Sequence, residues 1–468
     1  MSTVKQDFEI VGKLSSGTYG DVFLITIGTK YHALKICTLT SAQNHQLIHF
    51  LRDSIREFFF AQCLLSTHVL GYFVREYQDK TVRLGIAQSL ALSNLFQLGT
   101  LSIQQLRAYF KDVVVQLTDL HAQGILHRDI KPENILQMQT GRMLLTDPSL
   151  CIRHNAPQNP NVITLWYRPP ELLLEAEPCT SASDVWSLGI TILDTINKRP
   201  IFTKISTEAQ MIQAIGCYFG CSNTDPEWYQ KKVRRQMPQM TTFSIDESLQ
   251  DLLQQMLKIR PTERISMQAV LQHPFWTRQT PIQIVPIGST TIRCTKTSQD
   301  TKGSAIQQCK VHSLANQSSV ETRLLVLDTF LGITNVSKWP LRVVLSAMYL
   351  WDIYATARKE LCTKQLILAC LLFCAASIET DEEQFRNLKV LISESDLPRF
   401  QSCMIHVLGV LGPILPPIWK HAQKCRSEKD LVVYALGPNI WSEEYNKEDL
   451  DELVQSSCFS DTYISTFL

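Results

Sequence analysis

The sequence predicts an α+β fold, in which a small region rich in β-strands comes before a larger helical region. Residues 4 to about 90 contain several short segments of β-branched and aromatic residues and one helical stretch. From Ser102 onward, apolar residues recur with the 3.6-residue period of an α-helix. A polar stretch over residues 278–318 follows, and helical patterns return from about Val320. We therefore expect two structured regions joined by a polar linker.

Local patterns place the elements of the first region. Two strands are predicted at residues 22–25 and 31–36, with a turn at residues 28–30 between them. Residues 46–65 have helical spacing. The apolar positions on one face of this helix are Leu47, Phe50, Leu51, Ile55, Phe58 and Phe59. The expected result is a lobe made of a sheet and a single helix.

Composition limits the possible partners of the chain. Lys and Arg number 45 against 44 Asp and Glu, so we expect neither nucleic acid nor an anionic membrane as a partner. The longest uncharged apolar stretch, residues 366–376, is shorter than the ~20 residues of a membrane span. No secretory signal is expected at the start of the sequence. The 14 cysteines have no metal-binding spacing, which predicts reduced thiols and an intracellular protein, in the nucleus or cytoplasm.

A glycine-rich segment leads into the first predicted strand. Residues 15–22 fit the pattern G-x-G-x-x-G-x-V with serine at the first glycine. Glycines let a backbone approach phosphate oxygens closely, and successive N–H groups can then bind them. Tight turns also use glycine, so this segment alone leaves the turn alternative open. If it binds ATP, the contacting residues are Ser15, Ser16, Gly17, Thr18, Gly20 and Val22.

A lysine and a glutamate follow in the order strand, then helix. Lys35 lies in the second strand pattern, and burial of its ammonium group requires an anionic partner. Glu57 on the next helix and the phosphates of ATP could both be this anionic partner. Either residue could instead be an ordinary surface charge, but their order favours a functional pair.

The most specific motif is HRDIKPEN over residues 127–134. Asp129 is placed to accept the proton of a substrate hydroxyl, and Lys131 can neutralise charge on the transferred phosphoryl group. Asn134 can bind Mg²⁺, and Asp147, which follows a strand-like segment, can provide a second metal ligand. These residues predict phosphoryl transfer from ATP. The remaining alternative is a chain of the same shape that no longer catalyses.

Residues 4–277 resemble a protein kinase domain, and several further motifs resemble those of the cyclin-dependent kinases. The motifs are SIRE at 54–57, TLWYRPPE at 164–171, SDVWSLG at 183–189, RPTERIS at 260–266 and HPF at 273–275. The resemblance implies a bilobal fold with an N-lobe at about 4–90 and a C-lobe at about 91–277. It also implies that Ala33 and Lys35 belong to the ATP-binding residues.

The resemblance further implies a set of regulatory residues. They are Thr18 and Tyr19, which match an inhibitory phosphorylation pair, and Arg128, Thr164, Arg168, Glu171 and Arg264 in and around the activation segment. Arg264 would pair with Glu171, and Arg168 would shape a pocket for proline after the phosphoacceptor. Residues 147–149 read DPS where the family has Asp-Phe-Gly. Because Pro148 fixes φ and removes an N–H, we expect this segment to be stiffer.

The predicted activation segment lacks its usual switch. Between Leu150 and Ile163 there is no Ser, Thr or Tyr, and Asn159 occupies the usual phosphothreonine position. Phosphorylation at that position would add about two negative charges beside Arg128. We therefore expect another device to order this segment.

Residues 319–425 resemble a cyclin box, although a generic helical bundle remains an alternative. The segments that are similar to its helices are 323–331, 347–352, 367–379 and 396–422. Two polar residues with which cyclins hold the kinase helix correspond to Ser377 and Gln401. Covalent tethering could compensate for them, because it raises the effective concentration to the millimolar range. Residues 426–468 form a C-terminal tail without a readable motif.

Together these features predict an ATP- and Mg²⁺-dependent serine/threonine protein kinase. Its substrates would be proteins with Ser or Thr followed by Pro, and its activator would be its own cyclin-like domain or an external cyclin. The alternative is a pseudokinase–cyclin scaffold that binds cell-cycle or transcription regulators without turnover. Ser15, Pro148 and Ser149 favour the scaffold, and the intact catalytic loop opposes it.

Overall fold

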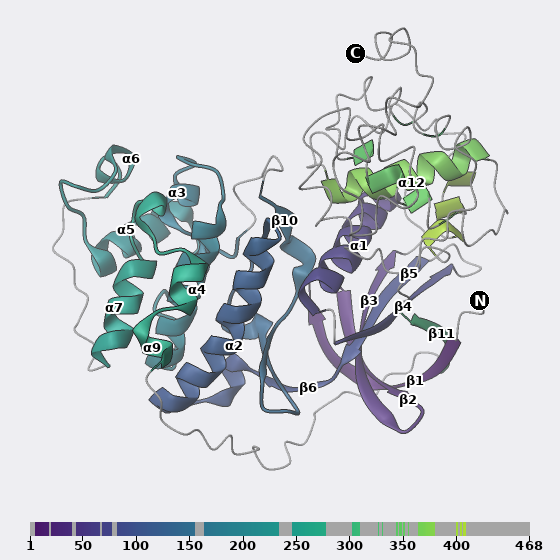
Figure 1. The fold of residues 1–468 in the computed structure, drawn as a ribbon, viewed down its shortest axis with the longest axis horizontal. Helices are drawn as coiled ribbons and strands as arrows, with labels where there is room; N and C mark the ends of the chain where they lie inside the picture. The colour runs from purple at the N-terminus through teal and green to yellow at the C-terminus, as the bar shows by residue number, and fades with distance from the viewer. Residues whose placement is uncertain are drawn as a thin grey trace, which may run out of the picture. The chain divides into compact units, whose positions relative to one another are not determined.

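The chain folds into two compact units, Met1–Cys309 and Lys310–Leu468. The structure is a computed structural model, and Figure 1 shows its course. In the first unit it describes residues 5–17, 20–39, 44–65, 68–76, 82–154, 163–233, 246–277 and 302–308. In the second unit it describes residues 364–379 and isolated helical positions between 326 and 408.

The N-lobe of the first unit is an antiparallel sheet that closes into a barrel. Its strands are β1 (Lys5–Gly17), β2 (Gly20–Ile27), β3 (Lys30–Leu39), β4 (Val69–Glu76), β5 (Val82–Ser89) and β11 (Lys302–Gln308), in the order β1-β11-β4-β5-β3-β2. The strands predicted at residues 22–25 and 31–36 are confirmed within β2 and β3. Gly28 adopts φ +60° between them, a conformation that favours glycine and suits a tight hairpin.

Strand β11 forms from residues that were expected to belong to the polar linker. It pairs with β1, where Lys5 lies opposite Gln307, and with β4, where Tyr72 lies opposite the same residue. The strand closes the barrel through backbone hydrogen bonds, which its polar sequence KGSAIQQ does not reveal. The chain therefore returns from the helical lobe to the N-lobe sheet before the second unit begins.

Helix α1 (Asn44–Leu65) covers the predicted stretch 46–65. Leu51, Ile55 and Phe59 are fully buried, as the apolar spacing predicts. The helix also buries polar residues, including Arg56 and Glu57. Because buried charges need partners, this part of α1 must contact charged or polar groups of other elements.

The C-lobe is helical. Its helices are α2 (Ile103–Ala122), α3 (Pro170–Leu173), α4 (Ser181–Asn197), α5 (Glu208–Phe219), α6 (Glu227–Gln230), α7 (Glu247–Met256), α8 (Met267–Leu271) and α9 (Pro274–Thr277). Helix α2 begins with a capping box in which the backbone and side chains of Ser102 and Gln105 bond reciprocally. Helix α4 is buried along residues 183–194 and forms the centre of this lobe (Figure 1).

Two small sheets position the segments that carry the chemistry. Their strands are β6 (Ala91–Asn94), β8 (Ile135–Met138) and β9 (Met143–Leu145) in one sheet, and β7 (Ile125–Leu126) and β10 (Ile152–Arg153) in the other. The HRDIKPEN segment runs from the end of β7 to the start of β8, and Asp147 follows β9. Because β8 pairs with β9, residues 134 and 147 are brought to the same end of that sheet.

The second unit is described around α12 (Lys364–Glu379). Residues Cys370 to Ala376 of this helix are almost completely buried, and the Phe373 and Phe400 rings pack edge-on with centroids 5.4 Å apart. The cyclin-like segment 367–379 lies in α12, whereas Gln401 and most of the other segments fall outside the described residues. A helix that is apolar all round indicates a packed core, which any helical bundle would also have.

No helix in the described part of the chain is both long and apolar enough to span a membrane.

Candidate active site

Strand β3 and helix α1 bring Lys35 and Glu57 together. Lys35 lies in register between Val22 of β2 and Ile86 of β5, in the middle of the sheet. Its Nζ is 2.6 Å from Glu57 Oε1 and donates a hydrogen bond of 3.0 Å to Asp147 Oδ1. The three side chains are 17%, 6% and 29% exposed, respectively. One ammonium group therefore joins the sheet, the helix and the segment after β9.

For Lys35 and Asp147, the opposite charges in this cluster affect the pKa more than burial does, whereas burial raises the pKa of Glu57 above its ordinary value. Burial by itself would lower the pKa of Lys35, but the carboxylates of Glu57 and Asp147 raise it above its ordinary value. Burial would likewise raise the pKa of Asp147, but the Lys35 ammonium lowers it. Both groups are charged at neutral pH. The alternative that Lys35 and Glu57 are ordinary surface charges does not hold, because they are buried partners.

Asp184 of α4 fixes the backbone of the catalytic loop. Its carboxylate accepts the backbone N–H groups of His127 and Arg128, both at 2.9 Å, and also contacts His121 Nε2 at 2.8 Å. Burial would raise the pKa of Asp184, but the hydrogen bond and charge of His121 lower it. Arg128 has φ +66°, a strained conformation for a residue other than glycine. Asp184 therefore holds the loop in a backbone shape that it would not adopt freely.

The Asp129 carboxylate lies at the centre of a short hydrogen-bond network. Its Oδ1 accepts a bond of 2.6 Å from the Thr164 hydroxyl. Its Oδ2 accepts bonds of 2.8 Å from both Lys131 Nζ and Asn134 Nδ2. Lys131 Nζ also donates to the Thr164 hydroxyl at 3.2 Å. The loop and the activation segment therefore converge on one carboxylate, which is 4% exposed.

The residues predicted to bind Mg²⁺ have the right donor atoms for it. Asn134 uses its Nδ2 to bond Asp129, which leaves its Oδ1 oxygen for a cation. Thr146 donates its N–H and its hydroxyl to the Asn134 carbonyl, at 2.8 and 3.1 Å, and so places Asp147 beside Asn134 in the structure. Oxygen ligands from an amide and a carboxylate suit Mg²⁺, which usually also binds substrate phosphates.

The glycine-rich segment is partly described. In the β1–β2 hairpin, Ser15 lies opposite Val22 and Gly17 opposite Gly20. Gly20 has φ +135°, and a Cβ there would lie 2.6 Å from the Ile36 carbonyl oxygen, so only glycine fits this close approach. Ser15 and Ser16 are exposed at the end of β1. Thr18 and Tyr19 lie outside the described residues.

An apolar surface lies next to this hairpin. Ala33 is buried with Leu24 and Leu90, and the side chains of Leu14 and Val22 pack against them. Val22 lies opposite Lys35 in the pairing of β2 with β3, and Ala33 precedes Lys35 by two residues on β3. The structure therefore places the expected ATP-binding residues of β2 and β3 together on one sheet.

Two arginines bind the first turn of the activation segment. Arg128 Nε donates to the Leu150 carbonyl at 2.8 Å, and Arg56 Nη2 of α1 donates to the Cys151 carbonyl at 2.9 Å. Burial, and then the charges of Arg52 and Arg128, lower the pKa of Arg56 to about 9. Sequence reasoning assigned no role to Arg56, although it precedes Glu57 in the SIRE motif. The sequence feature that could have indicated a role for Arg56 is its position beside Glu57, as a second charged residue on the buried face of the helix.

The DPS segment forms a short 3-10 turn, η3 (Pro148–Leu150). Asp147 precedes it with φ +59° in the left-handed region. Pro148 takes the first position of the turn, where its missing N–H leaves no hydrogen bond unmade. The proline is therefore compatible with an Asp147 carboxylate that points at Lys35.

The remaining predicted residues form two arginine clusters in the C-lobe. Arg264 donates to both oxygens of Glu171 at 2.7 and 2.6 Å, and both side chains are fully buried. Arg168 donates to the Ile163 carbonyl through Nε at 3.0 Å and through Nη2 at 2.8 Å, and it also pairs with Glu208 of α5. These contacts hold the end of the activation segment against the helices of the lobe.

A β-rich lobe with a lysine–glutamate pair, joined to a helical lobe with a tethered aspartate loop, is the architecture of a protein kinase domain. Residues 8–276 match the protein kinase domain family. This match covers more than half of the 468 residues, and the chain belongs to the protein kinase family.

Among its relatives are proteins named as cyclin-dependent kinases. The chain is 28% identical over 309 residues to Cyclin-dependent kinase 12 of Caenorhabditis elegans. The matched region is 58% of this chain and 40% of that protein. It is 26% identical over 299 residues to Cyclin-dependent kinase 15 of Danio rerio, with a matched region that is 56% of this chain and 67% of that protein. It is 32% identical over 226 residues to Cyclin-dependent kinase C-2 of Oryza sativa subsp. japonica, covering 45% and 42%. The relation to this group is distant and concerns the kinase domain.

Proposed function

We propose that the chain is an ATP-dependent protein kinase that phosphorylates serine or threonine. Lys35, held by Glu57, binds the phosphates of ATP, and the glycine-rich hairpin covers them. Asn134 and Asp147 would hold Mg²⁺, which would neutralise negative charge on the phosphates of ATP. Asp129 orients the substrate hydroxyl and accepts its proton, while Lys131 stabilises charge on the transferred phosphoryl group.

The observation that supports this proposal best is the assembled state of both halves of the site. Lys35 bonds Glu57 and Asp147 at 2.6 and 3.0 Å, so helix α1 lies in the position that binding of phosphates requires. At the same time Thr164 and Lys131 orient Asp129. An incoming hydroxyl can replace the Thr164 hydroxyl as a donor to the carboxylate.

A preference for proline after the phosphoacceptor follows from the contacts of Arg168. Its guanidinium group occupies the Ile163 carbonyl with two hydrogen bonds. A substrate N–H beside the Ile163 carbonyl would therefore lack a hydrogen-bond acceptor. Burying an N–H group without an acceptor costs about 1–3 kcal/mol. Proline has no N–H and avoids this cost. We expect Ser-Pro and Thr-Pro peptides to be preferred on a peptide array, and no enrichment of proline would refute this part.

We further propose that residues 310–468 activate the kinase in cis as a cyclin-like domain. Strand β11 pairs with β1 and β4 and ends at Gln308, and the second unit begins at Lys310. The second unit is therefore tethered to the N-lobe sheet, the lobe that also carries α1. Short tethers raise the effective concentration into the millimolar range, and this can compensate for the weaker polar groups at Ser377 and Gln401. An external cyclin is the alternative activator.

Location inside the cell also belongs to the proposal. The 14 cysteines of the sequence are scattered, with neither the spacing of a disulfide framework nor that of a metal site. Such cysteines suit a reducing compartment, which is also where ATP is available.

A non-catalytic scaffold is the second candidate, because Pro148 and Ser149 replace the family's Phe and Gly. The test compares full-length wild type with Asp129→Asn, using γ-labelled ATP, Mg²⁺ and a Ser-Pro peptide. We expect the variant to lose roughly 10³-fold or more in rate. Asp119→Asn, an exposed aspartate on α2, is the matched control and should keep the wild-type rate. Equal rates in wild type and Asp129→Asn would leave only the scaffold.

A further inference from the structure

Strand β9, which leads to Asp147, lies at the edge of its small sheet. The order of that sheet is β6-β8-β9, and no described strand pairs with the other edge of β9. Met143 and Leu145 of this strand are nevertheless almost completely buried. Buried backbone N–H and C=O groups on a free strand edge are destabilising unless another group bonds them. Another element must therefore supply hydrogen bonds to this edge.

Helix α2 supplies these bonds from two side chains that are one helical turn apart. Gln116 Nε2 donates to the Met143 carbonyl at 2.9 Å, and Gln116 Oε1 accepts the N–H of Leu145 at 3.0 Å. Asp112 Oδ2 accepts the N–H of Met143 at 3.0 Å. Residues four apart lie on the same face of a helix, so both side chains reach the strand. The amide of Gln116 therefore makes the donor and acceptor bonds that a neighbouring strand would make.

These bonds lie directly before a residue with a strained backbone. Asp147 has φ +59° in the left-handed region, a conformation that persists only where the surrounding structure holds it. Gln116 binds the N–H of Leu145 on one edge of β9, and the Asn134 carbonyl accepts the N–H of Thr146 at 2.8 Å on the other edge. The two residues before Asp147 are therefore held from both sides, which fixes where its carboxylate starts from the chain.

We propose that Gln116 is a positioning residue for the binding of a divalent cation by Asp147. The inference rests on the proposed kinase function, in which Asn134 and Asp147 are the metal ligands. Gln116 contacts neither the cation nor a substrate, and it acts through the backbone of β9. Without its amide, the Met143 carbonyl and the Leu145 N–H lose their bonds to α2. Strand β9 can then shift, and the Asp147 carboxylate leaves the position that suits a cation shared with Asn134.

The test uses full-length protein with Gln116→Met, which keeps the length of the side chain and removes both bonds to β9. Mn²⁺ is added with a non-hydrolysable ATP analogue, and the electron paramagnetic resonance signal of free Mn²⁺ gives its dissociation constant. We expect this constant to rise about tenfold, because losing a hydrogen bond around a metal ligand typically weakens metal binding by about 10–100-fold. Hydrogen exchange of a peptic fragment containing residues 143–147, measured without metal, should also become faster, because the Leu145 N–H loses its acceptor.

The matched control is Gln123→Met on the same helix. Gln123 Nε2 donates to the Asp119 carbonyl at 3.1 Å, just as Gln116 Nε2 also donates to the Asp112 carbonyl at 2.9 Å. The control therefore loses the same contact within α2 and keeps the bonds from Gln116 to β9. It should keep the wild-type affinity for Mn²⁺ and the wild-type exchange rate. Gln116→Glu keeps an acceptor for the Leu145 N–H, so its Mn²⁺ affinity should lie between those of wild type and Gln116→Met.

A wild type that binds Mn²⁺ with the nucleotide, and a Gln116→Met variant that binds it equally well, would overturn the inference and leave the kinase proposal standing. An equal loss of affinity in Gln123→Met, or weaker binding without faster exchange, would overturn it as well. If Gln116→Met shows no melting transition, the same comparison is made with Gln116→Glu, whose affinity must then lie below that of wild type. If wild type itself binds no Mn²⁺ with the nucleotide, the proposed function fails and this inference with it.

Discussion

Lys35 shows how one side chain can couple two lobes. Its ammonium group is shared between Glu57 and Asp147, and the pKa of each partner depends on the others. A neutral side chain at this position would leave the buried Glu57 carboxylate and the partly exposed Asp147 carboxylate without the cation that they share. Each residue of the cluster is therefore needed for the geometry of the other two.

Replacement of this lysine tests that coupling. In Lys35→Met we expect the rate of peptide phosphorylation to fall by about 10²-fold or more, because ATP loses its cationic contact and Glu57 its partner. The initial rate at saturating ATP measures this loss. Lys30→Met, at the exposed start of the same strand, is the control. A rate for Lys35→Met within a few-fold of that control would contradict the assigned role.

Asp194 gives the stability a predicted pH dependence. Burial, and then the charge of Glu133, raises the pKa of Asp194 from 3.8 to about 6. Between these values the folded protein binds this proton more strongly than the unfolded chain does, so the free energy of unfolding falls as pH rises. The full loss is roughly 2–3 kcal/mol. It should be complete above about pH 7 and absent below about pH 4.

Urea unfolding of wild type and Asp194→Asn across this pH range measures the effect. The difference between their free energies of unfolding should change by roughly 2 kcal/mol from pH 4 to pH 7, since asparagine does not titrate. Parallel pH profiles for the two proteins would show that Asp194 is not titrating as described.

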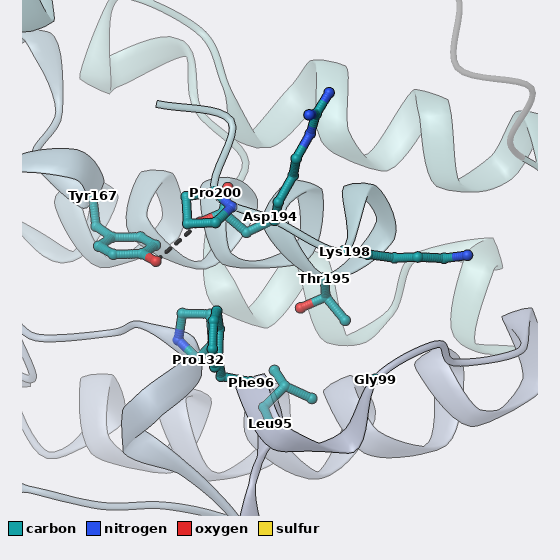
Figure 2. Close-up of a pocket in the computed structure, with 10 residues that line it drawn as sticks. Leu95, Phe96, Gly99, Pro132, Tyr167, Asp194, Thr195, Lys198 and Pro200 are labelled. Carbon is teal, nitrogen blue, oxygen red and sulfur yellow. Dashed lines mark hydrogen bonds between the residues drawn. The ribbon is translucent and has the colours of Figure 1, made fainter. Parts of the chain in front are cut away.

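Single residues were predictable where a motif places them in one short segment. Asp129, Lys131 and Asn134 lie within the same eight residues, and the structure shows them in one hydrogen-bond network. Asp184 and Asp194 were not assigned roles. Asp184 binds two backbone N–H groups and His121, and Asp194 binds Tyr167 (Figure 2) and the backbone N–H of Ile201. No local sequence pattern reveals these contacts. A charged residue within the apolar run of α4 was the available signal.

At the scale of elements, helix α1 is held to the activation segment without a phosphate. Arg56 and Arg128 bind the Cys151 and Leu150 carbonyls directly. These bonds fix the start of the activation segment, and the Lys35–Glu57 pair fixes helix α1 to strand β3. They order the start of the segment in a chain that has Asn159, and no threonine, at the usual position of phosphorylation.

The pair of Glu171 and Arg264 offers a test at this scale, because a second ion pair lies close to it in sequence. Both side chains of the first pair are fully buried, whereas Arg260 and Glu263 are 40% and 56% exposed. In Glu171→Ala we expect a loss of about 3–5 kcal/mol in the free energy of unfolding, since the Arg264 charge stays buried. Glu263→Ala should cost less than about 1 kcal/mol. Similar losses from both changes, measured by denaturant unfolding, would contradict this account.

Periodic elements were predictable and β11 was not. The strands β2 and β3 and the helix α1 follow their apolar spacing, because each buries one face against the core. Strand β11 is polar throughout most of KGSAIQQ, and its pairing depends on the free edges of β1 and β4. Backbone pairing of this kind leaves no mark in the hydrophobic pattern.

At the scale of the whole molecule, the path of the chain connects the kinase to its extension. The second unit begins two residues after β11, which is built into the N-lobe sheet. A domain attached there is tethered to the lobe that carries Lys35 and Glu57. This connection is the physical basis of the proposed activation in cis.

Removal of residues 310–468 tests that connection, because the remaining unit keeps β11. We expect the shortened chain to phosphorylate a Ser-Pro peptide at least about tenfold more slowly than the full chain, without added cyclin. Its melting transition should show that the kinase unit is still folded. Equal rates for the two chains would remove the activating role of the second unit.

The most direct measurement of the central claim is the fate of the γ-phosphoryl group. Purified full-length protein is incubated with ATP, Mg²⁺ and a Ser-Pro peptide, and phosphopeptide and ADP are quantified by mass spectrometry and chromatography. The account predicts phosphoserine in the peptide in amounts equal to the ADP formed. Absence of phosphopeptide, with or without release of ADP, would contradict it.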